Sequence, residues 1–124
     1  MTAGDINAIA RIDHTIIAQI RQLESVRPGL TKHLVEVFER NAVTFFEGID
    51  VRINAGDTET LRIGFHSMKG TAASLGAQRL SHIAGIAERI ASGDDASSSL
   101  LEITQALKLE FEATRIELMH AANT

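Results

Sequence analysis

The stretch FHSMKGTAASLGA, residues 65–77, decides how this chain folds and also raises the question of what it does. Its apolar residues recur at three- and four-residue steps, the spacing of one buried stripe on an α-helix. The stripe consists of Leu61, Phe65, Met68, Ala72 and Leu75. Each helical residue advances about 100°, so His66 lies about 140° from the stripe and faces water. The stretch therefore predicts a packed helix that exposes an imidazole ring.

Similar stripes occur along the rest of the 124 residues and predict an all-α fold. The turn signals VRPGLT, NAGDTE, LGAQ and SGDDASSS separate five helical segments. We expect them to run from near Asp13 to before Pro28, over 30–54, from Asp57, over about 77–92, and from about Ser97 or Ser98. Four longer helices joined by short turns predict an antiparallel up-down-up-down four-helix bundle with a short additional N-terminal helix. Residues 1–124 are expected to form a single domain whose motif core is 57–92.

The positions expected inside the bundle follow the same spacing on each of the other helices. They are Ile16, Ile20 and Leu23; Leu34, Val37, Phe38, Phe45 and Ile49; Leu80, Ile83, Ala84, Ala87 and Ala91; and Leu100, Ile103, Leu107, Phe111, Thr114 and Leu118. Asn41 falls within the second set, and we interpret it as a hydrogen-bonded polar core residue. Asp13 and Asp57 are predicted N-caps, and Gly93 is a predicted left-handed helix stop.

Composition narrows the classes of function. The formal charge is −4, and the twelve basic residues are scattered, whereas a nucleic-acid binder would gather them into a stripe. The sequence contains no cysteine and no apolar run long enough to cross a membrane, and its N-terminus lacks the order of an export signal. We therefore expect a cytoplasmic, monomeric protein that binds neither nucleic acid nor a membrane.

The residues beside His66 distinguish it from an ordinary surface histidine. Arg62 lies one turn before it on the same face, and Lys69 and Gly70 lie one turn after it. Gly70 costs about 1 kcal/mol of helix stability relative to alanine, and it faces away from the core. We interpret Gly70 as clearance for an incoming partner. Arg62 is either part of the same contact surface or a solvated charge.

This group of residues is suited to carrying a phosphoryl group. A neutral imidazole nitrogen is a good nucleophile towards phosphorus, and phosphorylation adds close to two negative charges. A lysine one turn away would stabilise that charge. A side chain of the adjoining helix that accepts a hydrogen bond from Nδ1 would leave Nε2 unprotonated, and Glu88 is the best-placed acidic candidate.

The motif H-S-M-K-G-x-x-x-x-x-G-A, here His66, Lys69, Gly70, Gly76 and Ala77, resembles that of a histidine-containing phosphotransfer (HPt) domain of bacterial two-component phosphorelays. The likeness extends to Leu80 and Ala87-Glu88 and covers about residues 12–120. It implies that His66 carries the phosphoryl group on Nε2, that Lys69 stabilises it, and that Glu88 orients the imidazole. Gly70 would leave room for the partner, and Gly76 would form a structural turn.

The resemblance also implies partners. The phosphoryl group would come from, and return to, an aspartate of a receiver domain in a response regulator or hybrid sensor kinase. The receiver itself would bind Mg²⁺, so no cofactor is expected on this chain. The resemblance also implies that the chain has neither kinase nor phosphatase activity of its own. We expect a small docking patch around His66 that includes Arg62, Gly70, Ala73 and Ser74, with contributions from the first two helices.

Other features give weaker signals. Gly64 departs from the family pattern and is expected to soften the helix one turn before the site. His14, His33, His82 and His120 are interpreted as surface residues, and Glu110, Glu112 and Glu117 as the wet face of the last helix.

Three other functions compete with that of a phosphoryl carrier. A histidine kinase would place an acidic residue after the histidine and would need a glycine-rich ATP-binding module, and a metal-binding bundle would need Glu-x-x-His pairs. No histidine of the chain is followed by an acidic residue, and the sequence has no glycine-rich ATP-binding module. Glu117 and His120 have the Glu-x-x-His spacing, but both are interpreted as surface residues, so no inward-facing pair is expected. A binding-only module that docks a response regulator or sensor kinase without accepting phosphate stays open as the alternative.

Overall fold

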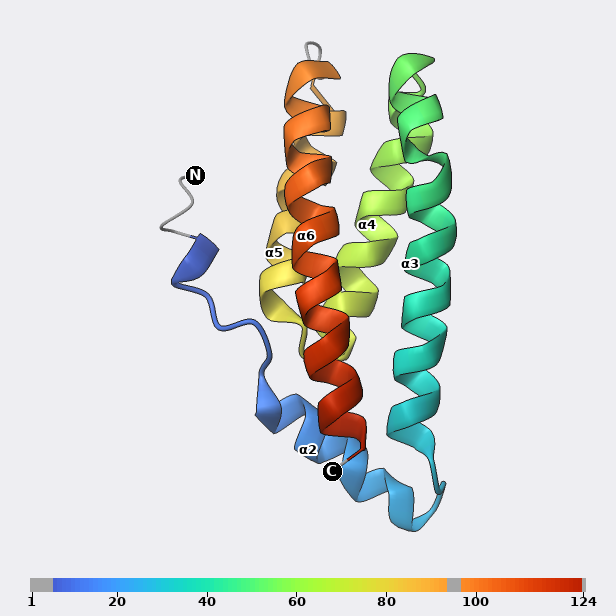
Figure 1. The fold of residues 1–124 in the computed structure, drawn as a ribbon, viewed down its shortest axis with the longest axis vertical. Helices are drawn as coiled ribbons and strands as arrows, with labels where there is room; N and C mark the ends of the chain where they lie inside the picture. The colour runs from blue at the N-terminus through green and yellow to red at the C-terminus, as the bar shows by residue number, and fades with distance from the viewer. Residues whose placement is uncertain (1–5, 94–96, 124) are drawn as a thin grey trace.

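The computed structural model describes residues 6–93 and 97–123, and every regular element in this part of the chain is helical. The helices are α2 (His14–Gln22), the 3₁₀ helix η1 (Leu23–Ser25), α3 (Leu30–Asn54), α4 (Thr58–Ser74), α5 (Gln78–Ala91) and α6 (Ser97–Ala122) (Figure 1). The predicted all-α fold and its helix boundaries are thereby confirmed. None of the described helices is both long and apolar enough to span a membrane.

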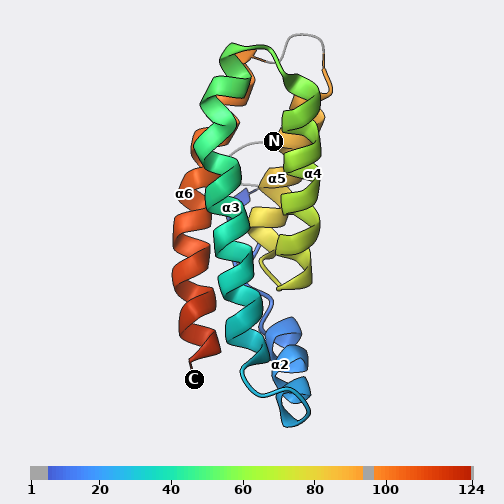
Figure 2. The same cartoon turned by 90° about the vertical axis from the view of Figure 1, so that its right-hand side faces the viewer.

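The helices α3, α4, α5 and α6 form the predicted antiparallel bundle. Each packs against the next along the chain, and α3 and α6 close the ring, with the most extensive interface between α4 and α5. Figure 2 shows that α3 and α6 extend past the turn between α4 and α5 at one end of the bundle. The short helix α2 lies at that end, where it packs against α3.

The core follows the predicted stripes closely on α4 and α5. The five residues of the predicted stripe between Leu61 and Leu75 are all buried, and so are the five core residues predicted on α5. On α6, Leu100, Leu107, Phe111, Thr114 and Leu118 are buried, and Ile103 is half-buried. An amphipathic pattern on one helix therefore identified the face that the bundle covers.

Two predicted core positions on α2 and α3 are wrong. Leu23 is 56% exposed, because α2 crosses only the end of the bundle and buries Ile17 instead. Asn41 is exposed, while the neighbouring Ala42 is buried. The buried line of α3 runs through Val35, Phe38, Ala42 and Ile49, which turns Asn41 toward a groove at the flank of the helix.

The predicted caps are largely confirmed. The Asp13 and Asp57 carboxylates accept hydrogen bonds from the backbone N–H groups of Thr15 and Thr60 and begin α2 and α4. Gly93 is not left-handed, because α5 ends on ordinary right-handed backbone at Ser92. A left-handed glycine with φ of 80° occurs instead at Gly76, in the turn between α4 and α5.

Gly76 also anchors the N-terminal segment. Its carbonyl accepts a hydrogen bond of 2.7 Å from the Asp13 N–H, and an added Cβ would lie 2.7 Å from the Asp13 carbonyl oxygen. The predicted structural role of Gly76 is confirmed by this contact. The turn that joins α4 and α5 is thus fastened to the start of α2.

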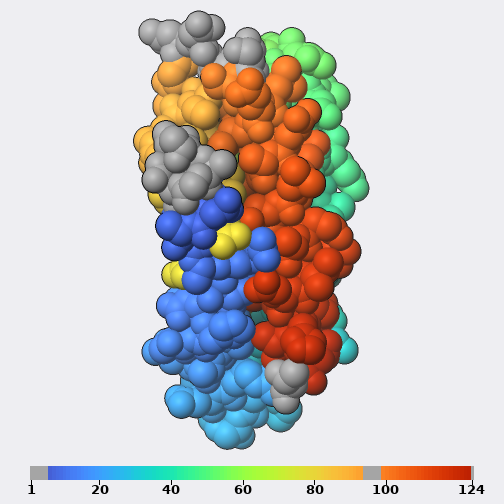
Figure 3. Space-filling model, turned by 60° about the vertical axis from the view of Figure 1, so that its left-hand side comes forward, coloured from blue at the N-terminus to red at the C-terminus, as the bar shows by residue number. Residues whose placement is uncertain are grey.

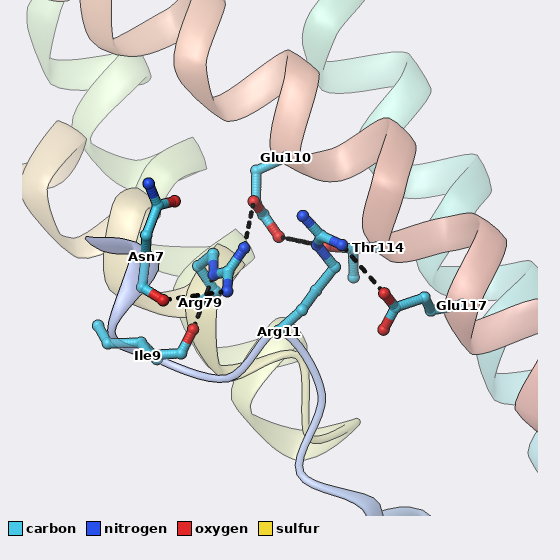
Figure 4. Close-up of polar contacts among 7 residues, drawn as sticks. All are labelled: Asn7, Ile9, Arg11, Arg79, Glu110, Thr114 and Glu117. Carbon is cyan, nitrogen blue, oxygen red and sulfur yellow. Dashed lines mark hydrogen bonds and ion pairs between the residues drawn. The ribbon is translucent and has the colours of Figure 1, made fainter. Parts of the chain in front are cut away.

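Glu110 corrects the prediction of a fully wet face on α6. Residues 6–13 run along α5 and α6 (Figure 3) and bring Arg11 within 2.7 Å of the Glu110 carboxylate, which is only 9% exposed. Arg79 of α5 lies 3.8 Å from the same carboxylate and donates to the Ile9 carbonyl (Figure 4). Glu117 also pairs with Arg11, but its side chain is 43% exposed, and Glu112 is exposed as predicted.

Gly64 has a packing role that the sequence did not reveal. An added Cβ at this position would lie 2.1 Å from the Phe45 ring of α3. The Phe45 ring in turn meets Phe65 edge to face, with ring centroids 5.3 Å apart. The missing side chain therefore lets the Phe45 ring reach α4, and α4 continues unbroken from Thr58 to Ser74.

Candidate functional site

The candidate site lies on α4, where two adjacent residues point in different directions. Phe65 is fully buried in the core, whereas the side chain of His66 is 65% exposed. The packing of the apolar stripe fixes the rotation of α4 about its own axis. His66 is therefore presented to solvent by a helix that the core holds in place.

Glu88 on α5 contacts both His66 and Lys69. Its Oε2 lies 2.8 Å from His66 Nδ1, and its Oε1 accepts a hydrogen bond of 2.7 Å from Lys69 Nζ. The hydrogen bond from Lys69 is the main cause that lowers the pKa of Glu88; desolvation opposes it, and the hydrogen bond from His66 adds a smaller lowering effect. Glu88 is therefore ionised at neutral pH, and this charge is lost only as the pH falls through its lowered pKa.

The ionised state of Glu88 favours one of the two neutral forms of the His66 ring. An ionised carboxylate can only accept hydrogen bonds, so Nδ1 carries the hydrogen that points at Glu88. The neutral ring then keeps its lone pair on Nε2, the nitrogen that Glu88 does not contact. The predicted proximity of Glu88 and His66 is present, and in a neutral ring this contact favours the tautomer that a nucleophilic Nε2 requires.

Lys69 is held more firmly than a free surface lysine. Its ammonium pairs with Glu88, its side chain is 41% exposed, and its backbone carbonyl accepts a hydrogen bond from the Ser81 hydroxyl. A Cβ added to Gly85 of α5 would lie 3.3 Å from Lys69 Cδ. Sequence reasoning missed Ser81 and Gly85, although a glycine on the buried face of α5 was a detectable sign of a close contact.

The remaining predicted residues, Arg62, Gly70, Ala73 and Ser74, lie on α4 before and after His66. Arg62 forms an ion pair of 2.7 Å with Glu59 on its own helix, and this pair raises the pKa of Arg62. Gly70, Ala73 and Ser74 are exposed, and nothing lies within 4 Å of the position that a Gly70 Cβ would take. The open space predicted beside the imidazole is present.

A groove of about 290 Å³ between α3 and α4 was not predicted; Gly64 and Ser67, which precede and follow His66 in the sequence, help to line it. From α4 its walls include Ser67, Thr71 and Ser74, which follow the exposed edge of the helix. From α3 they include Leu34, Val37, Phe38, Asn41, Ala42 and Phe45. Half-buried apolar residues beside exposed polar ones were the available sequence signal, but the sequence does not show how far apart two helices lie.

The other histidines differ in how far they are exposed. His14, His33 and His120 are exposed, which confirms their interpretation as surface residues, whereas His82 is half-buried. Among the residues that the structure describes, no group of three or more histidine or carboxylate side chains is placed to hold a metal ion.

The fold and the site together define a class of protein: a helical bundle that exposes a histidine, His66, held by the carboxylate of Glu88 beside the ammonium group of Lys69. The family model of the Hpt domain matches residues 33–117, and the chain is a member of that family. Among curated proteins, the chain is similar to the phosphorelay intermediate protein YPD1 of Candida albicans, with 32% identity over 71 residues. The match covers 57% of this chain and only 39% of that relative. No solved structure matches the chain.

Proposed function

We propose that this chain is a histidine phosphotransfer protein of a two-component phosphorelay, in which His66 accepts a phosphoryl group from a receiver-domain aspartate and passes it to another receiver. The observation that carries the proposal is the Glu88–His66 contact, because an Nδ1 hydrogen directed at Glu88 would leave Nε2 unprotonated on a side chain that is 65% exposed. Membership of the Hpt family and the likeness to a phosphorelay intermediate support the same function.

The transfer step would proceed by direct displacement. The Nε2 lone pair attacks the phosphorus of the aspartyl phosphate, the P–O bond to the aspartate breaks, and the carboxylate leaves with that electron pair. Positioning and electrostatic stabilisation supply most of the catalysis in such steps. Lys69 would stabilise the transferred group, since an ammonium has three N–H donors and one hydrogen bond to Glu88 leaves others available. Mg²⁺ bound by the receiver would neutralise charge on the phosphoryl oxygens.

The proposed function does not include kinase or phosphatase activity on this chain. The carrier exchanges the group with cytoplasmic receivers of response regulators or hybrid sensor kinases and acts as a monomer. A 124-residue chain that supplies only a nucleophile, its orienting carboxylate and an ammonium depends on its partner for the metal and the remaining oxygen ligands.

Incubation with a phosphorylated receiver tests this function. Label should move to the chain within the lifetime of the receiver phosphate, and it should be acid-labile and base-stable, as expected for phosphohistidine. The same chain incubated with ATP alone should stay unlabelled. Binding of the receiver without any transfer of label would favour the binding-only module.

The docking surface for the receiver comprises the exposed face around His66 and the adjoining α3–α4 groove. Its α4 part consists of Arg62, Gly70, Ala73 and Ser74 together with the groove wall. The α3 side chains that line the groove are mostly apolar, and none is charged. A small, partly apolar patch of this kind suits a transient encounter that must release its partner after each transfer.

Lys69→Ala should slow transfer to His66 by about 10- to 100-fold while the bundle stays folded, because the variant loses a charge-assisted contact to the phosphoryl group. Its partly exposed ion pair with Glu88 contributes little to stability. Rapid-quench transfer kinetics and urea unfolding measure the two effects. A loss of transfer accompanied by unfolding would show that the lysine is mainly structural.

Gly70→Gln should weaken receiver docking and leave the bundle at least as stable. Glutamine is a better helix former than glycine by roughly 0.5–1 kcal/mol, and its side chain would project into the open space beside His66. Calorimetric titration with the receiver should show a Kd raised about tenfold or more. Gly70→Ala is the matched control, since it gains helix propensity with far less bulk. Unchanged affinity in the glutamine variant would contradict the clearance role.

A further inference from the structure

The two carboxylate oxygens of Glu88 have different partners: Oε2 contacts His66 Nδ1, and Oε1 accepts a hydrogen bond from Lys69 Nζ. The Lys69 contact helps to keep the carboxylate ionised, and the carboxylate in turn accepts the Nδ1 hydrogen. Glu88 is only 17% exposed, so water screens these contacts less than it would on an open surface. The arrangement places a negative charge against Nδ1, on the side of the ring away from the phosphoryl acceptor nitrogen.

We propose that Glu88 keeps the proton on Nδ1 after His66 has been phosphorylated, so that the phosphoryl group leaves from a cationic ring and the chain is a readily discharged donor. The inference rests on the proposed function and extends it from accepting the group to giving it away. In this proposal Glu88 is a positioning residue that also determines whether the ring leaves as a neutral imidazole or as an imidazolate.

The chemistry of the two half-reactions shows why this proton matters. When the Nε2 lone pair bonds to phosphorus, Nδ1 still carries its hydrogen, and the ring becomes an imidazolium. If that proton stays, discharge breaks the P–Nε2 bond and returns the electron pair to Nε2, which leaves a neutral imidazole. If the proton has been lost to solvent, the same bond cleavage must release an imidazolate, which is a much poorer leaving group.

The charged groups around the ring come from two helices. Glu88 extends from α5, and Lys69 and Arg62 extend from α4, with Arg62 already paired to Glu59. The α3 side chains that line the groove carry no charge. Both cations would favour loss of the ring proton, so the Glu88 carboxylate is the group in this set that retains it.

The variant Glu88→Gln separates the hydrogen bond that orients the His66 ring from the negative charge of the Glu88 carboxylate. Its amide oxygen can accept the same Nδ1 hydrogen bond, but it lacks the negative charge that holds a proton on a cationic ring. Glu59→Gln is the matched control, because it removes a carboxylate from α4 whose two oxygens accept hydrogen bonds from Arg62 instead of from the ring.

The experiment follows hydrolysis of phosphorylated His66 against pH. The full chain, Glu88→Gln and Glu59→Gln are phosphorylated with phosphoramidate, and the ³¹P signal of His66 is assigned by its absence from His66→Gln. Glu88→Gln should hydrolyse about tenfold more slowly than the parent at pH 8, with its rate profile displaced to lower pH by about one unit. At pH 5 the two rates should converge, because both rings are then protonated. Glu59→Gln should follow the parent.

Two results would overturn the inference. Superimposable profiles for Glu88→Gln and the parent would show that the carboxylate does not hold the ring proton. A rate lowered by the same factor at every pH would show a purely structural effect. Because phosphoramidate loads the chain without a receiver, failure of receiver-to-chain transfer would count against the proposed function and leave this test intact.

Discussion

His66→Gln is expected to reduce phosphoryl transfer from a receiver to the background level of the assay. Glutamine keeps a polar side chain of similar reach, but its amide nitrogen has no lone pair available to attack phosphorus. The fold should be unaffected, because the His66 side chain is 65% exposed and substitutions of such residues usually change stability by less than about 0.5 kcal/mol. The measurement is acid-labile label on the chain after incubation with a phosphorylated receiver.

His33→Gln is the matched control for this variant, since His33 is also exposed but lies on α3, away from the Glu88 contact. It should accept label at the parent rate. Label that persists in His66→Gln and disappears in His33→Gln would relocate the acceptor. Loss of label in both variants would indicate a defect in docking or folding, which the unfolding curves of the two proteins would distinguish.

Phe65→Ala is expected to lower the free energy of unfolding by about 3–5 kcal/mol, the usual cost of truncating a buried phenylalanine. Phe65 is fully buried and meets the Phe45 ring edge to face at 5.3 Å. Removing it leaves a cavity between α4 and α3 and deprives the Phe45 ring of its partner. Since a small domain has only about 5–15 kcal/mol of stability in total, a large share would be lost.

Urea unfolding followed by circular dichroism measures this effect. Ile63→Ala is the control on the same helix: Ile63 is 55% exposed, and its truncation should change stability by less than about 0.5 kcal/mol. A change below about 1 kcal/mol in Phe65→Ala would mean that the bundle can close around the missing ring. Substitutions at two adjacent residues should thus have different effects: Phe65→Ala should lower the stability of the fold, and His66→Gln should abolish phosphoryl transfer.

The helices and their buried faces were predictable because the information is local. A stripe at three- and four-residue steps identifies the covered face of a helix whatever lies across from it, and Asp57 caps α4 through a contact within its own turn. The same reasoning placed His66 and Gly70 on the open side. The core positions predicted for Leu23 and Asn41 were wrong, because an apolar stripe identifies buried residues only where another helix covers that face.

Contacts between helices were harder to predict, because they depend on the spacing and rotation of two elements at once. The buried state of Glu110 depends on Arg11, which is 99 residues away in the chain. Gly64 appears as a helix weakness in the sequence, yet in the bundle it makes room for the Phe45 ring. The α3–α4 groove likewise exists only because two helices leave space between them.

The sequence by itself determined an all-helical chain with an imidazole, an ammonium and a glycine on one water-facing side of a helix, because helical periodicity ties position along the chain to direction in space. It also selected Glu88 as the candidate partner of the ring. Only the tertiary structure decided that this one carboxylate contacts both His66 Nδ1 and Lys69 Nζ, at 2.8 and 2.7 Å. The physical reason is that the packing of α5 against α4 sets the distance between their side chains, and contacts between side chains on separate helices depend on that distance.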